Sequence, residues 1–170
     1  LDACLADVEK RRIDKLVFLG DIVGYGADPG PCLEVVRDYC GKGAVAVLGN
    51  HDEAAVAGGS GMTATARRAI DWTRARLSDT QRAFLKDLPL TAREGDVLFV
   101  HASANDPGDW IYVTSEAKAL PPFRVSDARV ILCGHVHVPL LVSCDMQQRV
   151  RAQKVPMAQP GPLMRSRRWM

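Results

Sequence analysis

KLVFLGDIVGYG, residues 15–26, joins a short apolar run to a glycine-rich loop that carries Asp21. The apolar run predicts a buried strand that stops at the first glycine. A helix is predicted to follow the loop, because Asp28 can cap it, Pro29 suits its first turn and Gly41 suits its C-terminal end. This succession of strand, loop and helix is typical of an α/β fold.

The same alternation continues along most of the chain. Met62, Ile70 and Leu77 recur at helical spacing, and Ser78 with Gln81 forms the capping-box signature of another helix. Alternation of this kind predicts an α/β architecture in which the loops at the carboxyl ends of the strands carry the functional residues. Strands are predicted at 15–19, 44–48, 90–94, 96–100, 129–133 and 140–144, and helices at 29–41, at 62–77 and from Ser78 to Pro89.

The composition is that of a soluble globular domain. Of 170 residues, 47% are hydrophobic and 25% are charged, which is ordinary for such a domain. The longest apolar stretches fall far short of the about 18 to 20 residues that cross a bilayer, so no membrane partner is expected. Residues 1–12 lack the apolar segment of a secretory signal, and five cysteines without a CxxC pair indicate reduced thiols. We therefore expect a cytoplasmic location.

Charge is unevenly distributed along the chain, although the formal net charge is only +2. All 20 acidic residues lie within 1–145, whereas six of the 22 basic residues lie beyond it. The later segment, which includes QPGP at 159–162, has no sustained periodicity. A basic segment can bind nucleic acid or an acidic partner, but a solvated terminus is the favoured interpretation. We therefore predict one domain at 1–145 and a poorly ordered basic tail at 146–170.

The chemistry-bearing residues gather at the ends of the predicted strands. Asp21 follows the first strand, Asn50-His51-Asp52 follows the second, and the other histidines follow later strands. Because the carboxyl ends of strands in an α/β sheet meet along one edge, we expect these side chains to converge. Carboxylate, amide and imidazole groups together indicate a transition-metal site. The remaining histidines are His101, His135 and His137.

The glycine-rich loop at 20–26 has a second interpretation, as a dinucleotide-binding loop. That loop requires the spacing G-x-G-x-x-G at the start of a helix. Here Gly26 is followed by Gly30, one position late, and Pro29 and Pro31 remove N–H groups that a phosphate needs. An NAD-dependent oxidoreductase is therefore disfavoured, and a carboxylate exposed between glycines suits a metal ion.

GNHD at 49–52 also has a purely structural interpretation, as a helix start capped by Asn50. The tetrapeptide offers more chemistry than a cap. Asn50 supplies a neutral oxygen to a cation, His51 places a proton donor beside it, and Asp52 is expected to hold that imidazole in its charged form and orientation. His101 alone would be a satisfied core histidine, and it gains significance from the other histidines.

GHVH at 134–137 is the strongest local signal. In an extended segment, residues i and i+2 point the same way, so His135 and His137 are expected to present their imidazoles side by side. The alternative is a histidine pair without function on the surface. The position of every other histidine at a strand end argues against that alternative.

Together these motifs resemble those of the calcineurin-like metallophosphoesterase family. They are GDIVGYG at 20–26, GNHD at 49–52, His101 after a strand and GHVH at 134–137. Their details resemble the small bacterial phosphodiesterases of the family more than its protein phosphatases. The resemblance covers about residues 1–140 and implies a two-sheet sandwich flanked by helices, incomplete at its N-terminus and irregular at its C-terminus.

The resemblance implies a role for each motif residue. Five residues would bind two divalent metal ions: Asp21 as the bridging ligand, His137 at the first metal, and Asn50, His101 and His135 at the second. Substrate would contact Tyr25, Asn50 and His51. His51 would also assist the leaving oxygen, with Asp52 orienting it.

The implied activity is hydrolysis of small phosphate mono- or diesters by water, without a covalent intermediate. Two cations about 3.5 to 4 Å apart lower the pKa of the attacking water to near neutrality. Nitrogen and oxygen ligands without thiolate suit Mn, Fe, Zn or Co rather than Ca. Manganese is the cation that we expect to support activity first.

One motif of the family is missing. An Asp-x-His motif normally supplies two further ligands of the first metal, and here no histidine precedes His51. Residues 1–12 resemble the helix that follows that motif, so the chain is expected to begin downstream of the domain's start and to lack its first strand. With Asp21 and His137 alone, the first metal site would be weak. The alternative function is therefore a catalytically impaired metal-binding or regulatory module.

Overall fold

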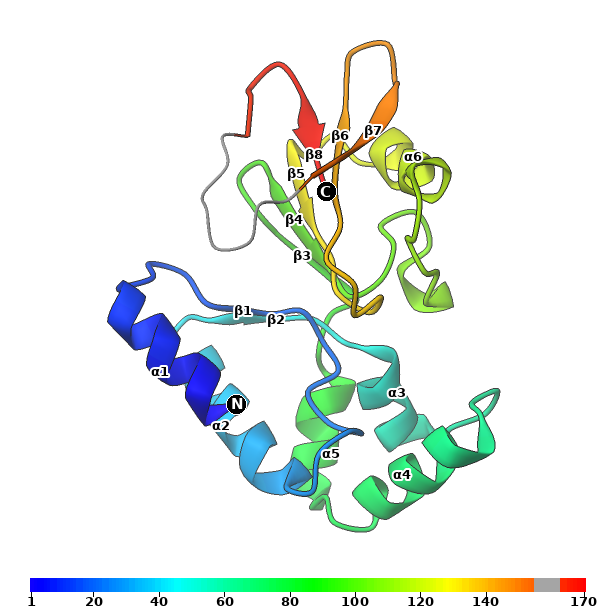
Figure 1. The fold of residues 1–170 in the computed structure, drawn as a ribbon. Coiled ribbons are helices and arrows are strands. Elements are labelled where there is room, and N and C mark those ends of the chain that lie inside the picture. Colours follow the sequence, from blue (N-terminus) through cyan, green and yellow to red (C-terminus); the bar gives the residue numbers. More distant parts are fainter. Residues whose placement is uncertain (155–162) are drawn as a thin grey trace.

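The structure, a computed structural model, describes residues 1–154 and 163–170 and consists of two sheets, each with its own helices (Figure 1). Residues 155–162, which include the QPGP segment at 159–162, lie outside the described residues. The helices are α1 (Asp2–Arg11), α2 (Pro29–Gly41), α3 (Asn50–Ala57), α4 (Ala64–Arg74), α5 (Asp79–Lys86), the 3-10 turn η1 (Pro107–Asp109) and α6 (Glu116–Val125).

The smaller sheet pairs β1 (Val17–Phe18) with β2 (Val45–Ala46) in parallel. The larger sheet has the strand order β3-β4-β5-β8-β6-β7 and mixes parallel and antiparallel pairs. Its strands are β3 (Thr91–Glu94), β4 (Val97–Val100), β5 (Val130–Leu132), β6 (Leu141–Cys144), β7 (Val150–Gln153) and β8 (Arg168–Trp169). Every strand predicted from the sequence is present, although β1 and β2 are shorter than expected.

The elements around the smaller sheet form as the sequence predicts. Helix α2 has Pro29 in its first turn and packs Leu33 and Val36 inward, but the predicted caps differ. The Asp28 side chain makes no capping hydrogen bond, and Gly41 is the last residue of the helix, with Lys42 at the cap position. The capping box of α5 is also confirmed, because the Ser78 hydroxyl accepts from the Gln81 amide at 3.2 Å and the Gln81 side chain accepts from the Ser78 amide at 3.0 Å. These helices enclose a core beneath β1 and β2.

Helix α6 covers one face of the larger sheet and was not predicted. Pro121 and Pro122 lie inside it, where proline normally removes a helical hydrogen bond. The helix forms nevertheless, because Ala119, Pro122 and Phe123 are buried against the sheet and the Ser115 hydroxyl caps its first turn. Tertiary packing here outweighs local helix propensity.

The segment after residue 145 has more structure than the sequence predicts. Strand β7 pairs with β6, and β8 lies between β5 and β6. Trp169 donates its amide to the Arg129 carbonyl at 2.8 Å, and Met170 exchanges two backbone hydrogen bonds with Val142. The sequence did not predict these two strands, because their pairing is non-local and leaves no periodic pattern. The domain boundary at 145 and the role of the basic tail stay predictions.

Two other expectations concern the N-terminal part and the membrane. The predicted helix within residues 1–12 is confirmed as α1. Across residues 1–154 and 163–170, none of the helices combines the length and the apolar character that crossing a membrane would require.

The core of the larger sheet gives a test of stability. We expect Ile131→Ala to lower the free energy of unfolding by about 2 to 5 kcal/mol, because its side chain is fully buried. Leu132→Ala, at the next position of β5 with a 42% exposed side chain, is the matched control and should cost about 1 kcal/mol or less. Urea unfolding followed by circular dichroism measures both, and equal losses would contradict the packing described here.

Candidate metal centre

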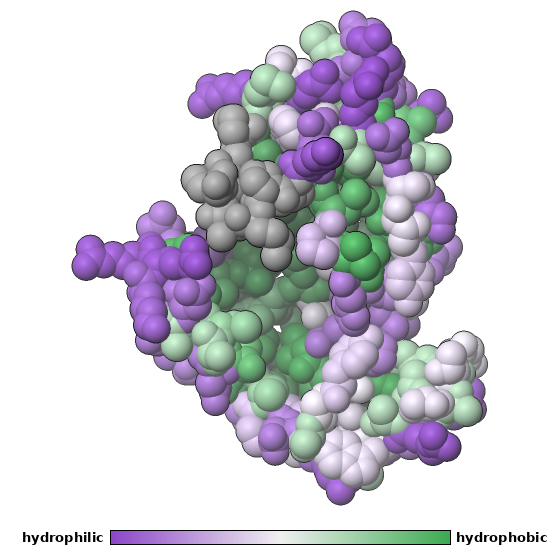
Figure 2. All heavy atoms as spheres, viewed as in Figure 1, coloured by the Kyte–Doolittle hydropathy of each residue, from purple (hydrophilic) through white to green (hydrophobic). Residues whose placement is uncertain are grey.

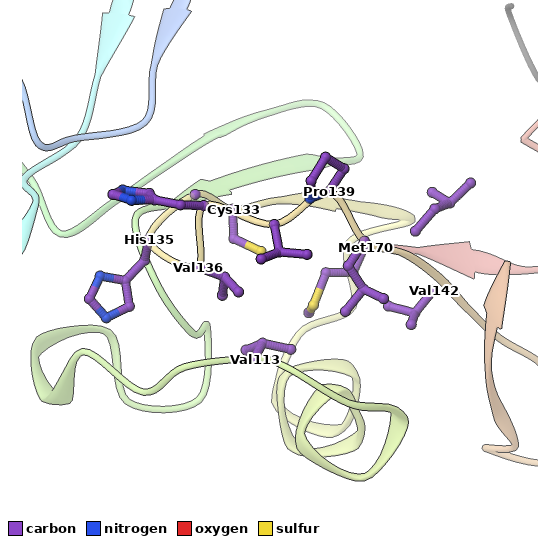
Figure 3. A pocket seen from close by; sticks show the side chains of 12 residues that line it. Val113, Cys133, His135, Val136, Pro139, Val142 and Met170 are labelled. Atoms are coloured by element: carbon purple, nitrogen blue, oxygen red, sulfur yellow. The ribbon is translucent and has the colours of Figure 1, made fainter. Parts of the chain in front are cut away.

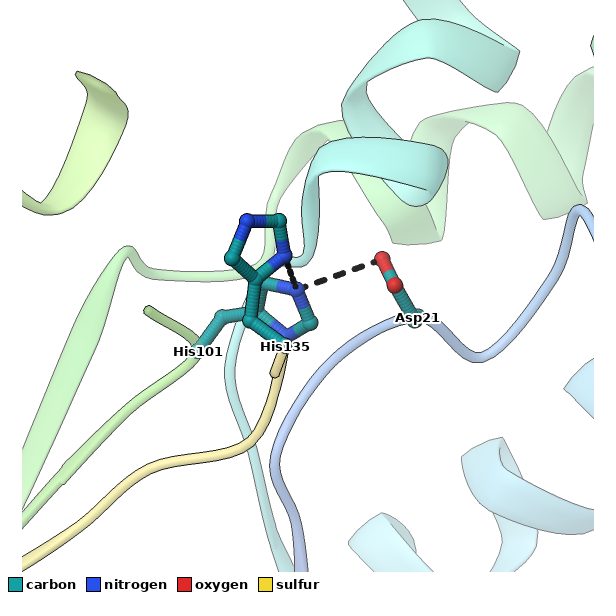
Figure 4. A group of neighbouring side chains, drawn as sticks. All are labelled: Asp21, His101 and His135. Atoms are coloured by element: carbon teal, nitrogen blue, oxygen red, sulfur yellow. Dashed lines mark hydrogen bonds and ion pairs between the residues drawn. The ribbon is translucent and has the colours of Figure 1, made fainter. Parts of the chain in front are cut away.

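Four loops from the two sheets converge on one place. Asp21 follows β1, Asn50 begins α3 after β2, His101 follows β4 and His135 follows β5. Figure 4 shows the side chains of Asp21, His101 and His135 turned toward one another. The expected convergence of strand ends is therefore present for these four residues.

The ligand atoms of these residues surround the Nε2 atom of His101. This nitrogen lies 3.1 Å from His135 Nδ1, 3.2 Å from Asn50 Oδ1 and 3.5 Å from Asp21 Oδ1. One ligand atom each from Asp21, His101 and His135 lies within 4.8 Å of the others. Both imidazoles are buried, so these groups meet in an environment with little water.

Backbone carbonyls determine which ring nitrogen of each histidine faces the group. His101 Nδ1 lies 2.6 Å from the Leu19 carbonyl oxygen, and His135 Nε2 lies 2.9 Å from the Trp110 carbonyl oxygen. A carbonyl only accepts, so each of these nitrogens carries the proton. In the neutral tautomers, His101 Nε2 and His135 Nδ1 therefore direct lone pairs at each other across 3.1 Å. A cation bound by both nitrogens relieves that repulsion.

Asp21 adds a negative charge that the described residues leave partly unsatisfied. Its Oδ1 accepts the His51 backbone amide at 3.0 Å, whereas Oδ2 is buried without a hydrogen-bond partner in the described part of the chain. Burying an unpaired carboxylate oxygen costs free energy that a metal ion would offset. The residues therefore fit a divalent cation held by nitrogen and oxygen ligands, the donor set of Mn, Fe, Zn or Co.

Tight backbone packing places Asp21 in this group. Gly20 has φ +81°, and a Cβ there would lie 2.7 Å from both the Gly49 amide nitrogen and His101 Nδ1. A Cβ on Gly49 would lie 2.2 Å from the Asp21 amide nitrogen and 2.4 Å from its Oδ1. Asp21 itself has φ 52°, a left-handed conformation that is uncommon outside glycine. The two glycines thus permit a contact that no side chain would allow.

Asp52 has partners other than those expected. Its carboxylate accepts the Val23 amide and the Gly49 amide, each at 3.0 Å, and so joins the glycine-rich loop to the start of α3. Burial raises the pKa of Asp52 to about 7, against the opposing effect of these two hydrogen bonds. The structure thus supports a positioning role for Asp52, in place of the predicted pairing with His51.

The His51 ring lies beside the metal-binding group. Its Nδ1 is buried without a hydrogen-bond partner among the described residues, and its ring stacks on Tyr25 with the ring centroids 4.2 Å apart. Burial lowers the pKa of His51, so the neutral ring is favoured over the expected charged form. The catalytic assignment of His51 and Asp52 stays a prediction.

His137 is absent from the group of ligand atoms that His135 joins, contrary to the expectation from the GHVH spacing. Both residues have left-handed backbones, with φ 63° at His135 and 58° at His137, so the segment is not extended and the i, i+2 rule does not apply. The His137 ring lies edge-on to Tyr25 at a centroid distance of 5.6 Å. Its predicted place at the first metal stays a prediction.

Trp110 is a residue of the site that the sequence motifs did not identify. Its backbone carbonyl accepts from His135, its indole N–H donates to Glu53 at 3.1 Å, and its φ of 53° is left-handed. Tyr112 follows, and its ring lies against His135 with the centroids 4.0 Å apart. The two aromatic residues Trp110 and Tyr112 in a long loop are the sequence pattern that could have indicated a functional role. A backbone acceptor such as the Leu19 carbonyl has no sequence pattern at all.

Two cavities adjoin His135. One of about 490 Å³ extends from Asn50, His51 and His135 to Tyr112 and the loop before α4. The other, of about 510 Å³, is lined mainly by apolar side chains such as Val113, Val142 and Met170 (Figure 3). Figure 2 shows hydrophobic residues gathered around the hollow between the part with α1 to α5 and the part with the larger sheet.

Fold and site together define an α/β protein with a metal-binding group where strands of two sheets end. The chain belongs to the calcineurin-like phosphoesterase superfamily, since that domain matches residues 1–168. The match confirms the resemblance and the fold class inferred from the four sequence motifs.

Relatives and solved structures agree with this assignment. The chain is 35% identical over 149 residues to an uncharacterised protein of Methanocaldococcus jannaschii, covering 84% of this chain and 59% of that one. It is 34% identical over 108 residues to a symmetrical bis(5'-nucleosyl)-tetraphosphatase of Methylococcus capsulatus, covering 62% and 38%. The chain thus spans less than two thirds of the length of these relatives.

Two solved structures are similar in fold. A metallophosphoesterase from Sphaerobacter thermophilus has a TM-score of 0.67 and 36% identity, with 81% of this chain and 56% of that chain covered. A hypothetical protein from Pyrococcus horikoshii has a TM-score of 0.73 and 18% identity, with 82% and 65% covered. The second likeness concerns the fold alone.

The contact between Gly49 and Asp21 gives a test of the centre. We expect Gly49→Ala to weaken manganese binding at least about tenfold, because the new Cβ would displace the Asp21 ligand. Gly26→Ala is the matched control, since a Cβ there meets nothing within 4 Å. Isothermal titration with manganese measures both, and unchanged affinity in a folded Gly49→Ala protein would contradict the ligand role of Asp21.

Proposed function

We propose that this chain carries the metal-dependent hydrolysis of phosphate mono- or diesters. The observation that supports it is the group formed by Asp21, His101 and His135, with two imidazole nitrogens facing each other at 3.1 Å and an unpartnered carboxylate oxygen beside them. Membership of the superfamily supports the reaction class. The fold has two packed hydrophobic cores, so we propose that the ligand group serves activity and not folding.

Each residue has a proposed part in this activity. Asp21, Asn50, His101 and His135 would hold one divalent cation, and His137 with Asp21 would contribute to a second. The bound cations would supply positive charge to the phosphoryl oxygens and lower the pKa of water. The Leu19 and Trp110 carbonyls keep the two ligand imidazoles in the correct tautomer.

His51 is proposed to act on the ester itself. Its backbone amide donates to Asp21 Oδ1 at 3.0 Å, which keeps the start of α3 beside a proposed metal ligand. Tyr25 stacks on the ring and is exposed, which supports a part in contacting substrate. We propose that His51 contacts the phosphoryl group and moves a proton at the leaving oxygen, and that Tyr25 contacts substrate.

A nucleotide is the first substrate class to test. One relative is a symmetrical bis(5'-nucleosyl)-tetraphosphatase, which makes a phosphate ester of a nucleoside a reasonable substrate for this chain. We propose a small phosphate ester as the partner, manganese as the first cation to add and the cytoplasm as the location.

The second candidate function is a metal-binding module without turnover. The observation that favours it is the position of His137, whose ring lies against Tyr25 and outside the group of Asp21, His101 and His135. A single cation held by that group would stabilise the junction of the two sheets without activating water. Its manganese stoichiometry would be one per chain.

Turnover distinguishes the two candidates. We expect the chain to hydrolyse bis(4-nitrophenyl) phosphate when manganese is added, and His135→Ala to abolish the manganese-dependent part. Val138→Ala controls for disturbance of the same loop, because its side chain is 67% exposed. One bound manganese per chain without any turnover would favour the metal-binding module and overturn the proposed hydrolysis.

Two further variants separate acid chemistry from metal binding. His51→Ala should lower kcat/KM by about 10²- to 10⁴-fold and leave manganese content nearly unchanged, because His51 is proposed to contact the phosphoryl group and move a proton at the leaving oxygen without binding metal. Asp21→Ala should lower both. Elemental analysis alongside the assay measures the difference, and equal loss of manganese in the two variants would refute these roles.

A further inference from the structure

The cavity of about 490 Å³ begins at the metal-binding group itself. Three of its lining residues, Asn50, His51 and His135, belong to the proposed catalytic machinery. Its volume lies within the about 300 to 1,000 Å³ of small-molecule sites. A group bonded to the phosphorus at the metal site would therefore extend into this cavity.

Tyr112 presents an aromatic surface to the cavity. One side of its ring lies against His135, at a centroid distance of 4.0 Å and an interplanar angle of 30°. The residue is nevertheless 52% exposed, so much of the ring remains available. His135 is in turn bonded to the Trp110 carbonyl, which holds the segment before Tyr112 in place. A preordered and partly exposed ring of this kind suits stacking with a planar group.

Glu53 supplies a hydrogen-bond acceptor on the same wall. Its Oε2 accepts the Trp110 indole N–H at 3.1 Å, which orients the carboxylate and leaves Oε1 as an acceptor for a hydroxyl or amino group. Ser60 and Thr63 add hydroxyl groups to the lining, and both residues are exposed. The polar side chains that line the cavity are therefore few, and they can accept hydrogen bonds from hydroxyl or amino groups of a ligand.

The charge of the cavity argues against additional phosphate groups. No lysine or arginine belongs to its lining in the described part of the chain, whereas Glu53 does. Arg74 approaches Gly58, one of the lining residues, without lining the cavity itself. A polyphosphate would place negative charge beside the Glu53 carboxylate, without the cationic groups that normally bind it.

We propose that this cavity binds the nucleoside part of a phosphate ester whose nucleoside is joined directly to the scissile phosphorus. The base would stack on Tyr112, and the sugar or base would donate to Glu53. The inference rests on the proposed hydrolysis, because it takes Asn50, His51 and His135 as the site of the phosphoryl group. It also specifies a substrate class, a phosphate ester of a nucleoside without further phosphate groups, in preference to a polyphosphate.

Adenosine binding to the metal-free protein tests this inference independently of turnover. After treatment with EDTA, the full chain should bind adenosine in isothermal titration and should not bind ribose, which lacks the base. Tyr112→Ala should weaken adenosine binding about tenfold or more, and Tyr112→Phe should restore it, because stacking requires the ring alone. Trp72→Ala, which removes an exposed aromatic residue outside the lining, should leave the affinity unchanged.

A second variant fills the cavity. Ser60→Trp places a large ring at an exposed lining position, and it should abolish adenosine binding while circular dichroism stays that of the parent protein. Absence of adenosine binding in the parent protein, or an affinity in Tyr112→Ala and Ser60→Trp equal to that of the parent protein, would overturn the inference. Adenosine binding without manganese-dependent turnover would overturn the proposed function alone, and turnover without adenosine binding would overturn this inference alone.

Discussion

Two backbone carbonyl oxygens, those of Leu19 and Trp110, hold the protonated nitrogens of His101 and His135 and so decide what the site can bind. With the outer nitrogens committed as donors, the inner nitrogens face each other with their lone pairs. Neither carbonyl belongs to a neighbouring residue in the sequence. Leu19 directly follows β1 of the smaller sheet, and Trp110 lies in the loop after β4 of the larger sheet. The metal-binding chemistry therefore depends on the position of the two sheets relative to each other.

That dependence explains why the backbone around Asp21 is so closely packed. Gly20, Asp21 and Gly49 bring the ends of β1 and β2 within a contact that a Cβ would prevent, and Asp52 joins the same two segments through the Val23 and Gly49 amides. Left-handed backbones cost free energy, and three of the non-glycine residues that adopt them, Asp21, Trp110 and His135, belong to this place. Strain of this kind is retained where it orients functional groups.

The sequence predicts the elements whose signals are local. Pro29 and the periodic apolar residues located α2, a capping box located α5, and apolar runs located the strands. The polar residues after those strands include Asp21, Asn50, His101 and His135, which the fold brings together. The failures of the sequence-based prediction have a common physical origin in non-local contacts. Packing on the sheet forms α6 despite Pro121 and Pro122, backbone pairing inserts β8 between distant strands, and carbonyls at Leu19 and Trp110 have no side-chain signature.

The left-handed backbone of the GHVH segment determines where His135 and His137 lie, and so bears on which of the two candidate functions applies. An extended segment would present both imidazoles side by side, whereas here His135 joins His101 and the His137 ring lies edge-on to Tyr25. His137 is outside the group of Asp21, His101 and His135, so its proposed ligand role concerns a second cation. Asp21 Oδ2, buried and without a partner in the described residues, is the remaining oxygen from which such a second cation would draw charge. The distinction between a hydrolase with two metals and a module with one thus reduces to whether His137 and this oxygen share a cation.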